Sequence, residues 1–472
     1  MKNRAGGHRL EHDLIGERKI PADAYYGVHT LRALENFPIT GTPIRIYPGL
    51  INALAFVKQA AANTNAELGL LEKKRRNAIV RACEEIRSGE LHDHFVVDVI
   101  QGGAGTSTNM NANEVIANRG LELMGHKKGE YQYLHPLEHV NMSQSTNDVY
   151  PTAVKVALRS EIEQLRNAMA VLRHEFEAKA REFTDVLKMG RTQLQDAVPM
   201  TLGQEFSTYA VMLAEDEQRL AEAGLLIQEI NLGATAIGTG LNAPPEYAAR
   251  VCRHLSDLTG LKLETAHNLI EATQDAGAFV QLSGVLKRVA VKLSKTCNDL
   301  RLLSSGPRAG LGEINLPAAQ AGSSIMPGKV NPVIPEVVNQ VAFEVIGNDV
   351  TVSFAAEAGQ LQLNAFEPII AHSLFKSLAH LRQGCLTLAG RCVHGITANK
   401  DFLRKSVGNS IGIVTALNPY IGYENATAIA KEAHATGASV YDLVLKKGLL
   451  TREQLDDLLR PEVLTQPRPL TK

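Results

Sequence analysis

The chain has 472 residues, of which 44% are hydrophobic and 21% charged, which suits a globular protein with a large apolar core and two or three domains. Its formal net charge of −1 excludes a strongly basic surface for nucleic acid or an anionic membrane. No uncharged apolar run is long enough to cross a bilayer, and the charged beginning MKNRAGGHRLEHDLIGERK lacks the apolar core of a signal peptide, so we expect a cytoplasmic protein.

Two proline-free stretches carry the clearest secondary-structure signal. Proline is absent between Pro151 and Pro199, and again between Pro245 and Pro307. In both stretches large apolar residues recur at alternating steps of four and three, the heptad spacing of a long helix packed in a bundle. These residues are Leu158, Ile162, Leu165, Met169, Leu172 and Phe176 in the first stretch, and Phe279, Leu282, Leu286, Val289, Leu293 and Leu300 in the second.

Two further long helices are predicted from weaker signals. The stretch from Phe206 to Ile227 keeps a looser heptad register. Pro335 is a good first-turn residue for another helix, which would run through Val345. Helices of this length, with only 5% aromatic residues and no regular strand alternation, predict an all-α protein.

These helices divide the chain into three predicted domains. Residues 1–141 include turn-rich stretches such as IPADAYYGVHT and should form a mixed, mainly helical domain. Residues 142–397 should form a central bundle of long helices, and residues 398–472 a small helical domain. Because one chain cannot bury all the apolar faces of the long helices, we expect the bundle to associate into the multi-helix core of an oligomer.

Four segments interrupt the helical pattern with small, polar, glycine-containing sequence. Hydroxyl and amide side chains dominate all four, and Arg191 and Lys329 are their cations. Such a set suits a small dianion, because neutral donors orient its carboxylates while one or two cations balance its charge. The segments are QGGAGTSTNMNAN at 101–113, NMSQSTND at 141–148, GRTQLQDAVP at 190–199 and GSSIMPGKVNP at 322–332.

The last segment contains the strongest candidate for a catalytic group. Two glycines and two prolines around Ser323, Ser324 and Lys329 predict a mobile loop with preset turns. A serine acts as a base only as an alkoxide, which Lys329 and the N–H groups of the loop could stabilise. Taken alone, the segment could also be a polar turn between helices without any chemistry.

Together, the four segments resemble the active-site blocks of the fumarase/aspartase superfamily, in the same order. GSSIMPGKVNP is similar to its signature loop, and the likeness extends from PADAYYGVHTLRALENF through NDLRLLSSGPRAGLGEINLP to NSIGIVTALNPYIG. GGAGTSTNMN, QSTND, VNPVIPEVVNQV and AEAGQLQLN resemble the aspartase form. Fumarases usually have Ser at the position of Ala104, Gln at that of Ser107 and a second Ser at that of Thr146.

Gln193 separates this sequence further from the fumarases. Fumarases and some aspartases have His there, paired with a Glu that corresponds to Glu336. A neutral amide does not titrate near pH 7, so water cannot be activated through an imidazole here. The resemblance implies an aspartate ammonia-lyase, a carbon–nitrogen lyase that reversibly converts L-aspartate to fumarate and ammonia. A class II fumarase and a non-catalytic structural homologue are the alternatives.

The resemblance also implies a role for each matching residue. Ser323 would remove the Cβ proton of aspartate, which leaves a dianionic aci-carboxylate for the surrounding donors to stabilise. Lys329 and Asn331 would hold the α-carboxylate with Thr192 close by, and Asn147 would face the amine, with Thr106 as a second contact. No general acid for the departing amine is evident. The residues that would bind the β-carboxylate are Thr106, Ser145, Thr146 and Ser324.

Quaternary structure and cofactors are likewise implied by the resemblance. Members of the superfamily are homotetramers in which three chains build each active site from these segments. No cofactor is required, and although divalent magnesium activates some aspartases, nothing in this sequence locates an ion. Neither the five cysteines nor the histidines have metal-ligand spacing. His135 and His139 lie where fumarases have a second anion site, but Leu137 and Glu138 depart from that pattern, so helix-cap or surface roles are expected.

Overall fold

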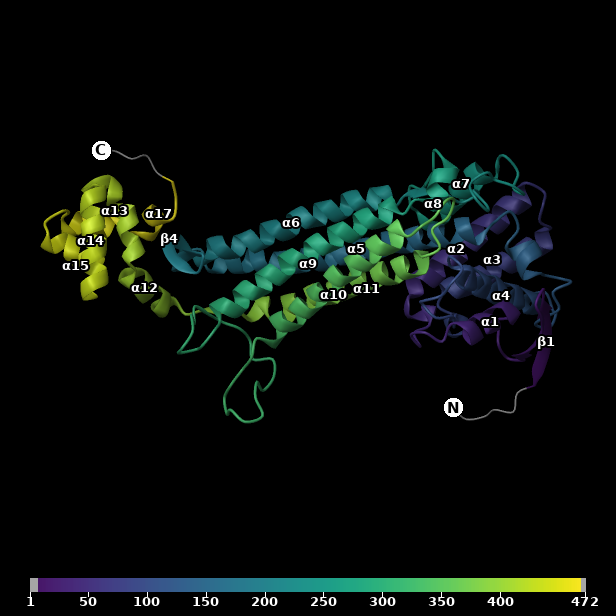
Figure 1. Ribbon diagram of the computed structural model, residues 1–472, viewed down its shortest axis with the longest axis horizontal. Helices are drawn as coiled ribbons and strands as arrows, with labels where there is room; N and C mark the ends of the chain where they lie inside the picture. The colour runs from purple at the N-terminus through teal and green to yellow at the C-terminus, as the bar shows by residue number, and fades with distance from the viewer. Residues whose placement is uncertain (1–6, 468–472) are drawn as a thin grey trace. The chain divides into compact units, whose positions relative to one another are not determined.

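The structure is a computed structural model that describes residues 7–467, most of which are α-helical (Figure 1). Residues 1–6 of the charged N-terminal segment lie outside the described residues. The described chain divides into two compact units, to both of which the long helices contribute. The domain boundaries after residues 141 and 397 stay predictions. The first unit comprises the described residues up to 166, 218–288 and 343–381, and the second comprises 167–217, 289–342 and the described residues from 382 onward.

The long helices confirm the predicted all-α class. The apolar positions spaced by fours and threes are buried throughout both proline-free stretches, as a packed seam requires. Pro335 lies in the first turn of its helix, as predicted. The long helices are α5 (Thr146–Glu182), α6 (Leu202–Leu226), α9 (Gly277–Leu303), α10 (Val333–Glu357) and α11 (Glu367–Arg391).

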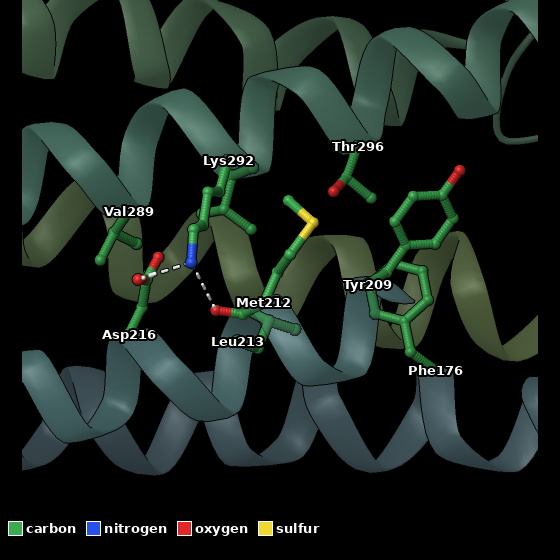
Figure 2. A pocket seen from close by; sticks show the side chains of 9 residues that line it. Phe176, Tyr209, Met212, Leu213, Asp216, Val289, Lys292 and Thr296 are labelled. Atoms are coloured by element: carbon green, nitrogen blue, oxygen red, sulfur yellow. Dashed lines mark hydrogen bonds and ion pairs between the residues drawn. The ribbon is translucent and has the colours of Figure 1, made fainter. Parts of the chain in front are cut away.

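Within the second unit, the helices pack through aromatic rings and paired polar groups. Phe176 of α5 contacts the rings of Phe206 and Tyr209 on α6, with centroids 6.1 and 5.3 Å apart. A small pocket lies beside these rings among α5, α6 and α9 (Figure 2). Its polar groups pair with each other, since Lys292 donates to Asp216 Oδ1 at 3.0 Å. The pocket is lined mostly by apolar side chains and is a packing gap in the core. None of the predicted site residues lines it.

The first unit contains shorter elements around its share of the long helices. The N-terminal strands pair as an antiparallel hairpin, and β5 pairs with β6 in parallel. These elements are β1 (His8–Asp13), β2 (Gly16–Pro21), α1 (Val28–Asn36), η1 (Ile44–Ile46), α2 (Pro48–Glu67), α3 (Lys73–Arg87), η2 (His92–His94), α4 (Thr106–Leu123), η3 (Pro136–Val140), β5 (Glu229–Ile230), α7 (Tyr247–Thr259), β6 (Glu264–Thr265) and α8 (Leu269–Gln274).

The second unit adds two more strand pairs and a group of short helices. Leu417, Ile429, Val444 and Leu455 are fully buried at the centre of that helix group. The elements of this unit are β3 (Leu187–Thr192), β4 (Gln195–Thr201), β7 (Ile314–Asn315), η4 (Val393–Gly395), β8 (Thr397–Ala398), α12 (Lys400–Asn409), η5 (Ile411–Ile413), α13 (Val414–Ile421), α14 (Tyr423–Thr436), α15 (Val440–Lys446), α16 (Arg452–Leu458) and α17 (Pro461–Leu464).

Three further features of the described residues concern the protein as a whole: the strands, the cysteines and possible membrane spans. The strands form only two-stranded sheets in the described residues, so they do not change the all-α class. All five cysteines are buried free thiols. In the part of the chain that the structure describes, no helix is long and apolar enough to cross a membrane.

Candidate active site

Thr106 is the first residue of α4, directly after a tight turn. Gly103, Ala104 and Gly105 all have positive φ values, of 92°, 54° and 88°. A Cβ at Gly105 would clash with the ring of Tyr150, so the turn needs glycine there. Thr106 Oγ1 donates to Gly103 O at 2.7 Å, and its side chain is exposed. The turn therefore places an exposed hydroxyl at a helix N-terminus, where backbone N–H groups favour a carboxylate.

Ser145, Thr146 and Asn147 lie at the start of α5, and Thr146 contacts α4. Ser145 Oγ accepts the N–H of Asn147 at 3.2 Å, which caps the helix. Thr146 Oγ1 accepts a hydrogen bond from Asn109 Nδ2 of α4 at 3.0 Å. The structure thus brings two of the four predicted segments together in the first unit. Asn109 was missed in the sequence, although it lies one turn after Thr106 on the same helix.

A proline explains how Asn147 is held. Pro151 has no N–H to bond the carbonyl of Asn147 four residues earlier. Asn231 Nδ2 donates to that carbonyl instead, at 3.0 Å. Asn147 Nδ2 in turn donates to Ala236 O at 2.7 Å. Residues 233–240 (GATAIGTG) therefore contact the start of α5 through Ala236.

Asp148 holds the same helix start from the buried side. It is fully buried and accepts N–H groups from Ser145 at 3.0 Å, Gly233 at 3.1 Å and Thr235 at 2.9 Å. Burial raises the pKa of Asp148 to about 7, and the three backbone N–H groups and Lys58 act in the opposite direction. Its side chain lies inward and fixes the turn that presents Ser145 to Asn147.

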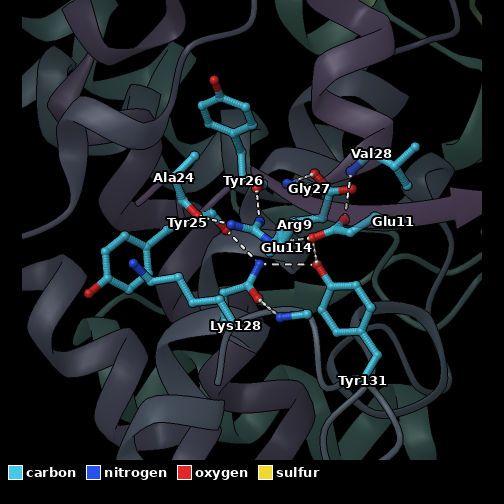
Figure 3. A network of polar contacts seen from close by, with 12 residues as sticks. Arg9, Glu11, Ala24, Tyr25, Tyr26, Gly27, Val28, Glu114, Lys128 and Tyr131 are labelled. Carbon is cyan, nitrogen blue, oxygen red and sulfur yellow. Dashed lines mark hydrogen bonds and ion pairs between the residues drawn. The ribbon is translucent and has the colours of Figure 1, made fainter. Parts of the chain in front are cut away.

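A polar network holds the middle of α4 (Figure 3). Glu114 accepts the N–H groups of Gly27 at 2.8 Å, His29 at 2.8 Å and Thr30 at 3.1 Å, at the start of α1. Glu11 of β1 accepts the N–H of Val28 at 2.9 Å beside it. Burial raises the pKa of Glu114 to about 7. The network joins α1, β1 and α4 and so fixes the helix that begins with Thr106.

In the second unit, Thr192 ends β3 and is exposed at the tip of the β3–β4 hairpin. Gln193 and Leu194 form that tip with φ values of 57° and 62°, an uncommon conformation for residues other than glycine. The adjacent Arg191 Nη1 lies 2.5 Å from Oε1 of the buried Glu313, and Lys188 Nζ lies 2.9 Å from its Oε2. A buried ion cluster thus anchors the hairpin that carries Thr192.

The signature loop closes on itself at its base. Gly322 N donates to Lys329 O at 2.9 Å, and Asn331 Nδ2 donates to Gly322 O at 2.7 Å. A Cβ at Gly322 would lie 2.5 Å from Lys329 O, so this closure requires glycine. Beyond the base, Ser324 and Lys329 are exposed, and Ser323 is half-buried. The loop therefore presents a hydroxyl group and an ammonium group from one closed turn.

The environment of Ser323 fits the predicted base. Ser323 Oγ accepts the backbone N–H groups of Ile325 at 3.2 Å and Met326 at 2.9 Å. Two N–H dipoles that point at this oxygen would stabilise an alkoxide more than a neutral hydroxyl. The two donors lie inside the loop, so they move with the serine.

The predicted site residues thus form two groups whose roles stay predictions. Thr106, Ser145, Thr146 and Asn147 share the starts of α4 and α5 in the first unit. Ser323, Ser324, Lys329 and Asn331 share the loop in the second unit, where Thr192 lies on the hairpin. His135 has the expected capping role, since its Nδ1 accepts the N–H groups of Leu137 and Glu138 at 3.1 and 3.2 Å.

Known proteins resemble the chain over almost its whole length. A family profile described as "Lyase" matches residues 16–347, and one described as "Fumarase C C-terminus" matches residues 413–466. An aspartate ammonia-lyase from Helicobacter pylori (strain J99) is 59% identical over 98% of this chain and 99% of its own. The aspartate ammonia-lyase from Escherichia coli (strain K12) is 57% identical over 97% and 96%.

Solved structures show the same fold. The crystal structure of a fumarate lyase:delta crystallin from Brucella melitensis bound to cobalt has a TM-score of 0.95 and 55% identity, covering 98% of this chain and 100% of that one. A recombinant class II fumarase from Schistosoma mansoni has a TM-score of 0.92 but only 35% identity, covering 96% and 98%. The higher identity to the aspartate ammonia-lyases agrees with the aspartase-like segments and with Gln193. The chain belongs to the fumarase/aspartase superfamily of lyases, in its aspartate ammonia-lyase family.

Proposed function

We propose that the chain catalyses the reversible deamination of L-aspartate to fumarate and ammonia, with Ser323 as the base. The observation that carries this assignment is the pair of backbone N–H groups, from Ile325 and Met326, directed at Ser323 Oγ. The similarity to aspartate ammonia-lyases supports the substrate. A fumarase needs to activate water, and Gln193 cannot act as a titrating base for that step.

The reaction would proceed in two steps. The Ser323 alkoxide takes the Cβ proton, and the electron pair of the broken C–H bond moves into the β-carboxylate to give the aci-carboxylate. The C–N bond then breaks, the electron pair of this bond leaves with the nitrogen as ammonia, and the carbon–carbon double bond of fumarate forms. Ser323 returns its proton to solvent before the next turnover. Each donor to the dianion would contribute about 3 kcal/mol to lowering the barrier.

The substrate contacts follow from the two groups of residues. Thr106, Ser145, Thr146 and Ser324 would bind the β-carboxylate, and Lys329 and Asn331 the α-carboxylate, with Thr192 beside it. Asn147, with Thr106, would face the amine. These donors, of which Lys329 is the charged one, would stabilise the dianion most strongly once loop closure excludes water.

The proposed assembly is a homotetramer in which three chains supply the segments of each site. An apolar stripe on α10 supports association. Phe343, Val350 and Phe354 are 61%, 51% and 71% exposed, at positions that share one helix face. On the same face, a side chain at Gly347 would meet nothing within 4 Å. A helix from another subunit could approach closely there and bury the stripe.

Two further points remain part of the proposal. No metal ion takes part in the steps above, and magnesium is assigned only a role as an activator, which adding and chelating magnesium during the assay would test. A cytoplasmic location is consistent with five buried free thiols, because reducing compartments keep cysteines unpaired.

Separate incubation with L-aspartate and with L-malate tests the function. Fumarate absorbance should rise with L-aspartate, and ammonia should appear in equal amount. With L-malate, absorbance should stay at the level of a heat-inactivated sample. Activity on malate alone would support the fumarase alternative, and inactivity on both would support the non-catalytic homologue.

A further inference from the structure

Lys58 of α2 is a fully buried lysine, with 0% of its surface exposed. Its Nζ donates to Asn141 Oδ1 at 2.9 Å and to Gln144 Oε1 at 3.0 Å. Burial lowers the pKa of Lys58 from 10.5 to about 7, although nearby Asp148 acts to raise it. Both hydrogen-bond partners are neutral amides, so no direct ion pair offsets the cost of burying this ammonium.

Both partners of Lys58 belong to the segment that leads into α5. Asn141 Oδ1 also accepts hydrogen bonds from Asn109 Nδ2 at 3.1 Å and Asn113 Nδ2 at 3.0 Å, both on α4. This single oxygen therefore joins α2 and α4 to the segment. Gln144 Nε2 donates to Val140 O and Met142 O, both at 3.0 Å, which fixes the turn before Ser145.

Two short routes connect this cluster to the proposed β-carboxylate ligands. Asn109 Nδ2 contacts both Asn141 Oδ1 and Thr146 Oγ1, so Lys58 is linked to Thr146 through two amides, those of Asn141 and Asn109. Gln144 is joined to Ser145 by the peptide bond, and Asp148 accepts the N–H of Ser145 at 3.0 Å. Lys58 and Asp148 thus both hold this segment, Lys58 through Gln144 and Asp148 through the N–H of Ser145.

We infer that Lys58 is a positioning residue for deamination, which holds Ser145 and Thr146 where negative charge develops on the β-carboxylate. The inference rests on the proposed function. The buried ammonium orients Asn141 and Gln144, and these set the position of the two hydroxyl groups.

The test compares Lys58→Met with Lys179→Met in the full-length protein. Lys179 is also buried, but it donates to Glu182 Oε2 and Ile396 O and to none of the proposed site residues. Wild type is first assayed on L-aspartate and L-malate, and both variants are then assayed on the substrate that it converts. A wrong proposed function is therefore visible in wild type alone, independently of the variants.

The expected result is a split between the two variants. Because a misplaced ligand of the transition state can cost about 10²-fold, kcat/KM of Lys58→Met should fall on the order of 10²-fold, mostly in kcat. Lys179→Met should stay within about threefold of wild type, with the same circular dichroism and oligomeric state for both. If folded Lys58→Met loses no more activity than Lys179→Met, the inference is overturned.

A double-mutant cycle distinguishes positioning from a general structural effect. If Lys58 acts through Thr146, Lys58→Met should reduce kcat/KM less in a Thr146→Val background than in wild type. Full additivity of the two changes would overturn the proposed route. Should Lys58→Met fail to fold, Gln144→Leu removes one of its two acceptors and should lower kcat about 10-fold, with unchanged kcat contradicting the inference.

Discussion

At the scale of single residues, the site depends on polar groups placed where water would normally solvate them. Ser323 Oγ accepts two backbone N–H groups, and Lys58 is buried among amide oxygens. Glu367 is a third case: it is only 7% exposed at the start of α11, and its Oε2 has no hydrogen-bond partner among the described residues. The pKa values of Lys58 and Glu367 therefore differ between the folded and the unfolded chain.

The variant Glu367→Gln tests how this buried carboxyl group makes the free energy of unfolding depend on pH. Burial raises the pKa of Glu367 from 4.5 to about 8, so the folded chain binds this proton more tightly than the unfolded chain. Wild type should therefore lose stability as pH rises from 4.5 through 8, whereas the variant lacks this dependence. Denaturant unfolding should show equal stability near pH 5 and an advantage for the variant on the order of a few kcal/mol at pH 9. Parallel pH profiles would contradict the assignment.

The sequence allowed some residues of the site to be predicted and not others. The resemblance to the fumarase/aspartase superfamily identified Ser323 and Thr106, and also the hydroxyl residues Ser145 and Thr146 at the start of α5. It gave no reason to select Asp148 or Lys58, whose partners become visible only when α2, α4 and α5 meet. A lone lysine in the apolar run INALAFVKQAA was the available signal for Lys58, because an unpaired charge among apolar helix residues needs a specific partner.

At the scale of elements, the heptad spacing was sufficient to predict the long helices, but not the hairpin that carries Thr192. Two-residue hairpin turns can usually be recognised in a sequence by the dipeptides Asn-Gly or Asp-Gly. Here Gln193 and Leu194 occupy the positive-φ positions, so the sequence GRTQLQDAVP gives no turn signal. Glu313, which anchors the hairpin, lies 122 residues from Arg191, beyond the reach of any local pattern.

Arg191→Met tests whether this anchor positions Thr192. The variant leaves the buried Glu313, which is 1% exposed, with Lys188 as its remaining ion-pair partner, and Lys188 also pairs with Glu205. The free energy of unfolding should fall by about 2–4 kcal/mol, because removing one partner leaves buried charge uncompensated. A shifted Thr192 should also lower kcat/KM about 10-fold. Arg308→Met, at an exposed position, is the control and should match wild type in both measurements.

At the scale of the whole molecule, the chain exposes apolar surface that a monomer would normally bury. Phe354 of α10 is 71% exposed and continues the stripe of Phe343 and Val350. The sequence indicated that the long helices have too many apolar faces for one chain, and the exposed stripe on α10 is consistent with this. The identity of the covering surface was not predictable from spacing, because it depends on a second copy of the chain.

Phe354→Glu should prevent assembly. Burying a carboxylate without a partner costs several kcal/mol, and four copies would be affected in a tetramer. Light scattering after gel filtration should show wild type as a tetramer and the variant as smaller species with little activity. Tyr423→Glu on α14, at a 77% exposed site outside the bundle, should remain tetrameric. A fully active tetramer of Phe354→Glu would rule out this stripe as a subunit interface.

The central claim is that the hydroxyl of Ser323 becomes basic enough to deprotonate carbon. The most direct measurement is the rate of fumarate formation from saturating L-aspartate by Ser323→Ala, with Ser406→Ala on α12 as a serine control. Loss of the base should lower kcat on the order of 10³-fold, while circular dichroism and oligomeric state stay as in wild type. The control should keep the wild-type rate. Turnover by Ser323→Ala at the wild-type rate would show that another group removes the proton.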